Sequence, residues 1–220
     1  TVTCVVSKGY ALSEAVEVSQ YYIEKAEIPA EFMVKIGGDY ENQQDSFSGL
    51  FTLLFLIVIL VYVVMASQFE SLLDPFVIMF SVPFAIVGVL IGITVNGMAL
   101  DVMALIGILI LVGIVVKNGI VLIDYAILCR ERGMDVNTAV TTASQQRLRP
   151  ILMTTLTTVL GMIPMALGSG EGAEMWNGLG ITVSWGLTVS TLITLVLIPT
   201  IYAIFISRRE KRQAKKLLKI

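Results

Sequence analysis

The chain has 220 residues, of which 56% are hydrophobic and 15% are charged, and its mean hydropathy is +0.85. A soluble domain is roughly 45–50% apolar and about 25% charged, so this composition predicts an integral membrane protein. The net charge of −2 hides a segregation, because residues 1–45 hold eight acids and three lysines, whereas residues 208–220 hold seven bases and one acid. The absence of histidine and the presence of only two cysteines exclude the usual ligand sets for zinc, haem and iron–sulfur clusters.

The first 45 residues predict a strand–helix–strand piece. Residues 1–7 are rich in β-branched side chains, residues 11–26 have apolar positions at a helical period, and residues 31–36 alternate polar and apolar side chains. A β-α-β piece of about 40 residues is too small for a core of its own, so we expect it to be the end of a larger α+β domain. The chain begins inside the first strand with no signal peptide, which predicts a fragment.

Five apolar segments follow, each long enough to cross a bilayer, for which a helix needs about 20 residues. They cover residues 46–69, 75–96, 102–124, 150–167 and 178–206. Pro83 is expected to kink the second segment, because proline cannot donate a helical hydrogen bond. The predicted fold class is therefore an α-helical membrane protein with five transmembrane helices, preceded by the short β-α-β piece.

Basic residues predict the orientation of these helices. Lysine and arginine in short loops mark the cytoplasmic side. Four arginines lie between the third and fourth spans: Arg130, Arg132, Arg147 and Arg149. This connection and the basic tail, residues 208–220, are therefore predicted to be cytoplasmic, which places residues 1–45 outside. Within the connection, residues 136–147 predict an amphipathic helix on the inner membrane surface, with Asn137 as a candidate N-cap.

Lys117 is the charge that most directly indicates function, because it lies inside the third span. A lysine at the centre of a bilayer costs about 3 kcal/mol on insertion scales, and such residues usually face a helix bundle and mark ion or proton pathways. The alternative is that Lys117 snorkels to the interface along its apolar stem. A relay lysine needs a carboxylate, and Asp124 is about 10 Å away along the helix at 1.5 Å per residue. We therefore expect its partner on a helix outside this chain.

Hydroxyl side chains are frequent in the last two predicted spans, where most of them are explained by close helix packing. Thr154 is a stronger functional candidate, because it lies seven residues after Arg147 and therefore on nearly the same helix face. If that face meets Lys117, a polar strip runs from the cytoplasm towards the middle of the membrane.

Three motifs carry a family resemblance. They are ASQFESLLDPFVIMFSVPFAIVGV at residues 66–89, GIVVKNGIVLIDYA at residues 113–126 and RLRPILMTTLTTVLGMIPMALGSGEG at residues 147–172. In order and spacing they resemble the C-terminal half of resistance–nodulation–division (RND) efflux transporters, and most closely the hydrophobe/amphiphile branch, the AcrB-like multidrug pumps of Gram-negative bacteria. The resemblance runs over essentially the whole chain.

The resemblance implies a proton relay in the middle of the membrane. Members of the family combine two aspartates on one transmembrane helix with a lysine, an arginine and a threonine on two others. On this sequence the matching positions are Lys117 with the adjacent Asn118, Arg147 and Thr154. In members of the family, the aspartate pair lies in the N-terminal half of the protein, which this chain does not cover.

The resemblance also implies a function. It predicts a secondary active transporter, not an enzyme, that needs no cofactor and uses the proton motive force to export amphiphilic compounds. It further predicts a homotrimer in the bacterial inner membrane, with residues 1–45 periplasmic and the C-terminus cytoplasmic. The implied partners are a periplasmic adaptor, an outer-membrane channel and the lipid bilayer, with no nucleic acid. One alternative is a related membrane protein in protein export or in lipid or metal handling. Another is a membrane enzyme, but the sequence contains no nucleophile–base pair or metal cluster to support it.

Overall fold

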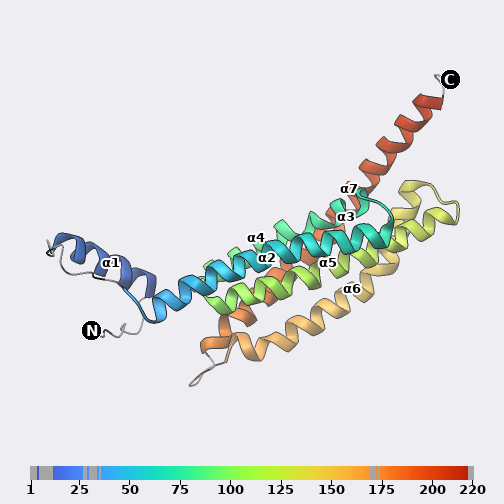
Figure 1. Cartoon of the computed structure of the whole chain (residues 1–220). Helices are drawn as coiled ribbons and strands as arrows, with labels where there is room; N and C mark the ends of the chain where they lie inside the picture. Colours follow the sequence, from blue (N-terminus) through green and yellow to red (C-terminus); the bar gives the residue numbers. More distant parts are fainter. Residues whose placement is uncertain are drawn as a thin grey trace. The chain divides into compact units, whose positions relative to one another are not determined.

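The computed structural model describes residues 12–26, 36–168 and 174–217, together with Cys4, Pro29, Val34 and Gly172. All regular secondary structure in the described residues is helical (Figure 1). The chain divides into two compact units, Thr1–Leu53 and Leu54–Ile220.

The first unit contains α1 (Leu12–Lys25) and the beginning of α2 (Asp39–Phe69). Helix α1 corresponds to the helix predicted over residues 11–26. Its basic residue in the last turn, Lys25, favours the helix because a cation there interacts well with the helix dipole. The two predicted strands fall almost entirely outside the described residues, so the β-α-β piece is not shown.

The second unit is a helical bundle made of the rest of α2 and five further helices: α3 (Leu73–Met79), α4 (Ser81–Asn96), α5 (Val102–Glu131), α6 (Val136–Ala166) and α7 (Glu174–Leu217). Within the described part of the chain, five helical segments are long and apolar enough to cross a membrane: Tyr40–Phe69, Leu73–Asn96, Val102–Glu131, Val136–Ala166 and Met175–Arg209. The number of these candidate membrane spans agrees with the five that the sequence predicts.

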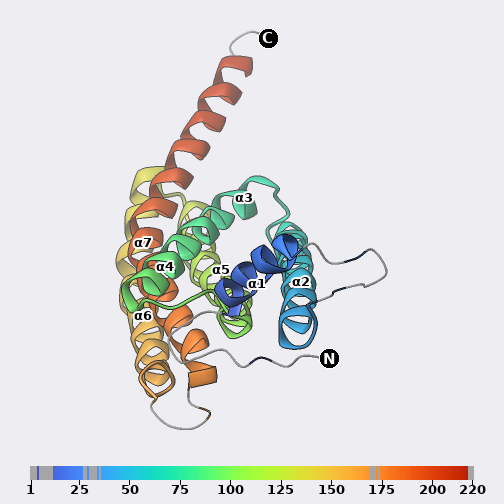
Figure 2. The same cartoon turned by 90° about the vertical axis from the view of Figure 1, so that its left-hand side faces the viewer.

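Helix α7 is the centre of the bundle, because it packs against α4, α5 and α6. In Figure 2 it lies beside α4 and α6. Small residues allow this close packing. A Cβ atom built on Gly88 of α4 would lie 3.0 Å from the Cα atom of Gly186 and 2.8 Å from the Cβ atom of Val189, both in α7. The two backbones therefore meet where neither helix carries a large side chain.

The second span breaks close to its proline. Helix α3 ends at Met79 and α4 begins at Ser81, with Phe80 between them. Pro83 has no N–H to donate to the carbonyl of Met79, and its ring crowds that carbonyl. The break therefore occurs in the turn before Pro83, where the sequence predicts a kink.

Helix α6 differs from the prediction. The expected surface helix over residues 136–147 and the expected span over residues 150–167 form one continuous helix that runs through Pro150. Proline in a helix removes one backbone hydrogen bond, but its fixed φ is compatible with helical geometry, so the helix continues. The N-cap is Asp135 and not Asn137, since the Asp135 carboxylate accepts a hydrogen bond from the Thr138 N–H at 3.4 Å.

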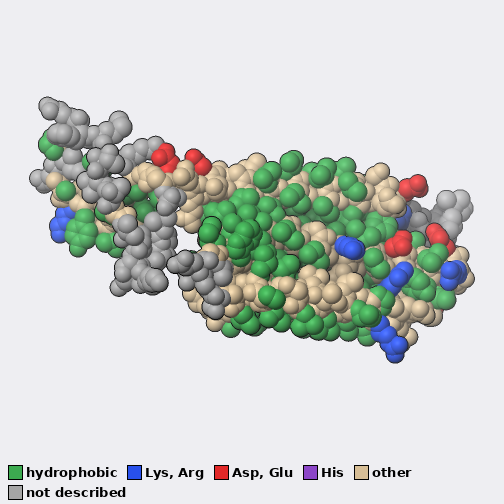
Figure 3. Space-filling view, turned by 90° about the horizontal axis from the view of Figure 1, so that it is seen from below, with side chains coloured by type: hydrophobic (Ala, Val, Ile, Leu, Met, Phe, Trp, Pro, Cys, Tyr) green, Lys and Arg blue, Asp and Glu red, His purple; other side chains and the backbone are tan. Residues whose placement is uncertain are grey.

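The membrane-spanning helices differ in how much of their surface the bundle covers. In α5, 56% of the most apolar 18-residue window is buried, whereas the corresponding values are 6% in α2 and 11% in α6. Figure 3 shows hydrophobic side chains along the middle of the bundle, with most charged side chains towards one end. Exposed apolar faces of this kind fit contact with lipid or with further helices.

Candidate proton-relay site

Helix α5 places Lys117 and Asn118 near its middle. The helix begins after Asp101, whose carboxylate caps it by accepting a hydrogen bond from the Ala104 N–H at 2.6 Å. Lys117 lies 16 residues after Asp101, which is about 24 Å along the axis at 1.5 Å per residue. A bilayer core about 30 Å thick therefore contains both Lys117 and Asn118.

A small cavity of about 150 Å³ lies between α5, α6 and α7, and Lys117 lines it. We call it the lysine cavity. It is lined by Ile114, Lys117, Asn118, Thr154, Thr155, Thr158 and Leu187. Three of the four relay residues predicted from the sequence, Lys117, Asn118 and Thr154, therefore share one cavity.

The walls of the lysine cavity differ in exposure. Asn118 and Thr155 are buried, with 9% and 8% of their surfaces exposed. Lys117 and Thr154 are exposed in this chain. Among the residues that the structure describes, Lys117 has no carboxylate within ion-pair distance. The cavity thus has a closed side of amide and hydroxyl groups and an open side that carries the ammonium group.

The hydroxyls of helix α6 are arranged in two ways. Thr154 donates to the carbonyl oxygens of Pro150 at 3.2 Å and Ile151 at 2.9 Å, and Thr158 donates to the Thr154 carbonyl at 2.9 Å. The Thr155 hydroxyl instead hydrogen-bonds the Thr191 hydroxyl of α7 at 3.2 Å. Thr154 can therefore accept a hydrogen bond in the cavity, but its own hydrogen is committed to its helix.

Arg147, the fourth predicted relay residue, does not line the lysine cavity. Its guanidinium carbon lies 4.7 Å from the centre of the Tyr125 ring, which is a cation–π contact between α6 and α5. The side chain is half-buried, and its Nε atom is buried with no hydrogen-bond partner among the described residues. Seven residues separate Arg147 from Thr154, about 10 Å along the helix, so the arginine lies beyond the cavity towards the start of α6.

Sequence reasoning missed Thr155, Tyr125 and Thr191. The run of threonines in α6 signals polar contacts, but the sequence alone does not show which threonine faces α7. Tyr125 directly follows Asp124 at the end of the predicted span, where aromatic residues are common, and nothing in its position indicates an arginine partner.

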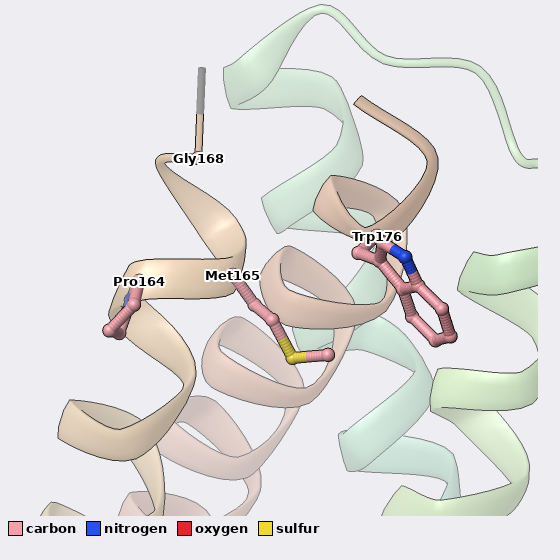
Figure 4. A pocket seen from close by; sticks show the side chains of 4 residues that line it. All are labelled: Pro164, Met165, Gly168 and Trp176. Carbon is pink, nitrogen blue, oxygen red and sulfur yellow. The ribbon is translucent and has the colours of Figure 1, made fainter. Parts of the chain in front are cut away.

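A second, larger pocket lies at the other end of α6 and the beginning of α7. It has a volume of about 370 Å³ and is lined by Pro164, Met165, Gly168 and Trp176. Figure 4 shows these residues at the ends of the two helices. Among the residues that the structure describes, none of those lining this pocket carries an ionisable group.

The comparisons with known proteins agree on one family. A family model described as the AcrB/AcrD/AcrF family matches residues 1–206. The chain is 45% identical over 101 residues to the multidrug resistance protein MdtC of Erwinia tasmaniensis, a match that covers 46% of this chain and 10% of that protein.

The fold also matches solved structures. Two crystal forms of a heavy metal efflux pump superpose with TM-scores of 0.78 and 0.72, at 31% and 33% sequence identity. They cover 91% and 89% of this chain and 20% and 19% of the pump. The chain thus spans about a tenth of the curated relative and a fifth of the solved pump. The family match over residues 1–206 confirms the resemblance, and the chain belongs to the AcrB/AcrD/AcrF family.

Proposed function

We propose that this chain is part of a secondary active transporter that uses the proton gradient to export amphiphilic compounds. The observation that carries the proposal is the lysine cavity, which joins Lys117, Asn118 and Thr154 from two candidate membrane-spanning helices. A lysine inside a membrane span is costly, and its usual role is in an ion or proton pathway. The 45% identity to a multidrug resistance protein supports amphiphilic compounds as the substrate class.

In the proposed mechanism, Lys117 pairs with carboxylates of a neighbouring part of the complete protein. Protonation of those carboxylates removes the attraction between them and the ammonium group. The change in charge favours a different arrangement of the helices, and the part of the protein outside the membrane turns this rearrangement into export. The protein is then a transporter without a cofactor and not an enzyme.

Arg147 has a separate role in this proposal. Because it lies outside the lysine cavity and stacks on Tyr125, it acts at the cytoplasmic end of the pathway, where protons leave. The proposal places the complete protein in the bacterial inner membrane as a homotrimer, with residues 1–45 in the periplasm. A periplasmic adaptor and an outer-membrane channel complete the export route.

A second candidate function is metal export. It is favoured by one observation, the TM-score of 0.78 to a heavy metal efflux pump. The described residues contain no group of three or more His, Cys, Asp or Glu side chains that would hold a metal ion. We therefore rank metal export second.

The experiment that tests the proposal uses the complete transporter in proteoliposomes with an imposed pH gradient. Transport of an amphiphilic fluorescent dye is compared with transport of a divalent metal ion. We expect dye transport that requires the gradient and stops when a protonophore is added. Gradient-independent dye transport would contradict the proposal, and transport of the metal ion alone would replace it with the second candidate.

A further inference from the structure

The larger pocket, at the end of α6 and the beginning of α7, follows from how these two helices meet. A Cβ atom built on Gly180 of α7 would lie 2.6 Å from the Ala166 nitrogen and 2.9 Å from the Ala166 Cα atom, so the two backbones touch there. Trp176 lies four residues before Gly180 and therefore on the same face of α7, one turn closer to its start. Because α6 ends at Ala166, no further turn of α6 fills the space beside Trp176, and a pocket of about 370 Å³ remains.

The lining of this pocket, which we call the indole pocket, is apolar. It consists of Pro164, Met165, Gly168 and Trp176, and Figure 4 shows Met165 reaching from α6 towards the side on which Trp176 lies. An indole offers a flat apolar face and a single N–H donor. A methionine side chain adapts to partners of different shapes and packs well against aromatic rings. This lining therefore suits an uncharged, flat aromatic group better than an ion.

The indole pocket is held in place by a contact between its two walls. The Asn177 side-chain amide of α7 donates to the Gly168 carbonyl oxygen at 3.4 Å, which ties the residues after α6 to the first turn of α7. Small-molecule sites are usually largely pre-formed, mostly apolar and about 300–1,000 Å³ in volume. The indole pocket agrees with this description in its volume and in its lining.

The surroundings of the indole pocket connect it to the apolar surface of the bundle. Leu167 and Met175 are the neighbours of Gly168 and Trp176 in the sequence, and 76% and 61% of their surfaces are exposed. One candidate membrane span ends at Ala166 and the next begins at Met175. Tryptophan is common at such span ends, where lipid meets water. A compound dissolved in the bilayer therefore meets apolar side chains on its way to the pocket.

We propose that the indole pocket binds the uncharged aromatic part of an amphiphilic compound that is dissolved in the bilayer. The aromatic ring stacks on the Trp176 indole and packs against Met165, while the polar part of the compound stays at the mouth of the pocket. This inference rests on the proposed function for the class of compound. Binding itself needs neither Lys117 nor a pH gradient, so the two can be tested separately.

The test uses the complete transporter in lipid nanodiscs, without a pH gradient, and benzophenone as the probe. Irradiated benzophenone reacts with nearby C–H bonds, including those of methionine, so mass spectrometry can follow its attachment to Met165. Met153 is the internal control, because it lies on the same helix and is 70% exposed but does not line the pocket. We expect attachment to Met165 to saturate and to fall when diphenylmethane, which has the same two rings but no photoreactive carbonyl, is added. Attachment to Met153 should rise in proportion to the benzophenone concentration and should not respond to diphenylmethane.

Substitutions of the two tryptophans test the role of the indole. Trp176→Ala should raise the benzophenone concentration for half-saturation at Met165 about tenfold, the scale of one lost aromatic contact. Trp176→Phe keeps an aromatic ring and should raise this concentration only about twofold. Trp185→Phe is the matched control and should have no effect, because Trp185 lies on the same helix but packs against Gly92 of α4. Trp176 is 47% exposed, so its replacement should leave the protein folded.

Three results would overturn the inference. Attachment to Met165 could rise linearly, as at Met153, or Trp176→Ala could saturate at the same concentration as the unsubstituted protein. Decanol, which resembles a lipid chain, could compete as strongly as diphenylmethane, which would show that the pocket holds lipid chains instead.

The same measurement separates this inference from the proposed function. Saturable attachment to Met165 in a transporter that lacks gradient-driven dye transport would support the indole pocket and contradict the proposed function. Gradient-driven dye transport together with linear attachment to Met165 would leave the proposed function standing and overturn only the indole pocket.

Discussion

Asn118 and Lys117 are neighbours in the sequence with opposite exposure, and this contrast defines the site at the residue scale. Asn118 is 9% exposed and forms part of the closed wall of the lysine cavity, whereas the Lys117 side chain extends from the open side. A neutral amide can donate and accept hydrogen bonds without a change in its charge. Of the described residues that line the cavity, Lys117 is the one that carries an ionisable group.

The neutrality of Asn118 can be tested with Asn118→Asp in the complete transporter. A carboxylate in the same cavity would pair with the Lys117 ammonium, since opposite charges within about 4–6 Å stabilise each other's charged forms. The lysine would then be less available to its proposed partner carboxylates. We expect gradient-driven proton flux to fall strongly while the amount of membrane-inserted protein stays the same. Asn118→Gln is the control that keeps the amide, and unchanged flux in Asn118→Asp would show that the cavity tolerates a second charge.

At the scale of the elements, α6 gives the clearest account of what the sequence could predict. Its apolar segment was identified from composition, because a membrane span needs only length and hydrophobicity. Its continuation through Pro150 could not be predicted, because a single proline permits either a break or a continuous helix. The Thr155–Thr191 contact could not be predicted either. The periodicity of a helix shows which residues share a face, but not which other helix that face contacts.

The start of α6 carries a pH-dependent cap. Hydrogen bonds from Thr138 hold the pKa of the Asp135 carboxyl below its ordinary value. A lowered folded-state pKa means that the cap stabilises the helix fully above the unfolded-state pKa, about 3.9. This stabilisation is lost as the pH falls below that value and through the folded-state pKa.

We therefore expect amide hydrogen exchange in the first turn of α6, corrected for the intrinsic rate, to speed up as the pH falls below about 4. Asp135→Asn keeps a capping side chain without a titratable group and should remove the pH dependence. An acid-induced loss of protection of equal size in both proteins would contradict this assignment.

The contact between α4 and α7 predicts an effect of Gly88→Ala. A Cβ atom at this position would lie 3.0 Å from both the Gly186 Cα atom and the Trp185 carbonyl oxygen, and these backbone atoms cannot move aside. Overpacking of this kind typically lowers the free energy of unfolding by about 1–3 kcal/mol. Gly161→Ala in α6 is the control, since nothing lies within 4 Å of a Cβ there. Thermal unfolding of the complete protein in detergent would measure the stability of both variants. Equal stability of Gly88→Ala and Gly161→Ala would rule out a tight α4–α7 contact.

At the scale of the whole molecule, the exposed apolar faces and the distribution of the basic residues indicate a bundle embedded in a membrane. The most apolar window of α2 is 6% buried, which leaves nearly all of that surface for lipid or other helices. The number and order of the spans were predictable, because hydropathy is a local property of the sequence. The separation of Arg147 from the lysine cavity was not, because it depends on a stacking contact with Tyr125 from another helix.

The orientation can be tested by cysteine labelling in the complete transporter. Cys4 and Cys129 are first replaced by serine, since Cys4 is exposed and would react. Single cysteines at Gly172 and Gln213 are then treated with a membrane-impermeant thiol reagent. The distribution of basic residues predicts labelling at position 172 from the outside and at position 213 only after the membrane is opened. Labelling of positions 172 and 213 from the same side of the membrane would contradict the five-span topology.

The central claim is that the Lys117 ammonium is part of a proton relay, and gradient-driven proton flux in Lys117 variants tests it most directly. Lys117→Ala removes the positive charge, and its loss should raise the pKa of the partner carboxylates. They would then keep their protons, and flux should fall about 100-fold or more, the usual scale for losing a proton-transfer group. Lys117→Arg keeps the charge but replaces a compact ammonium with a wide planar guanidinium, so it should also fail. A Lys117→Arg transporter with unsubstituted flux at matched abundance would contradict the relay and support a lysine that only snorkels to the interface.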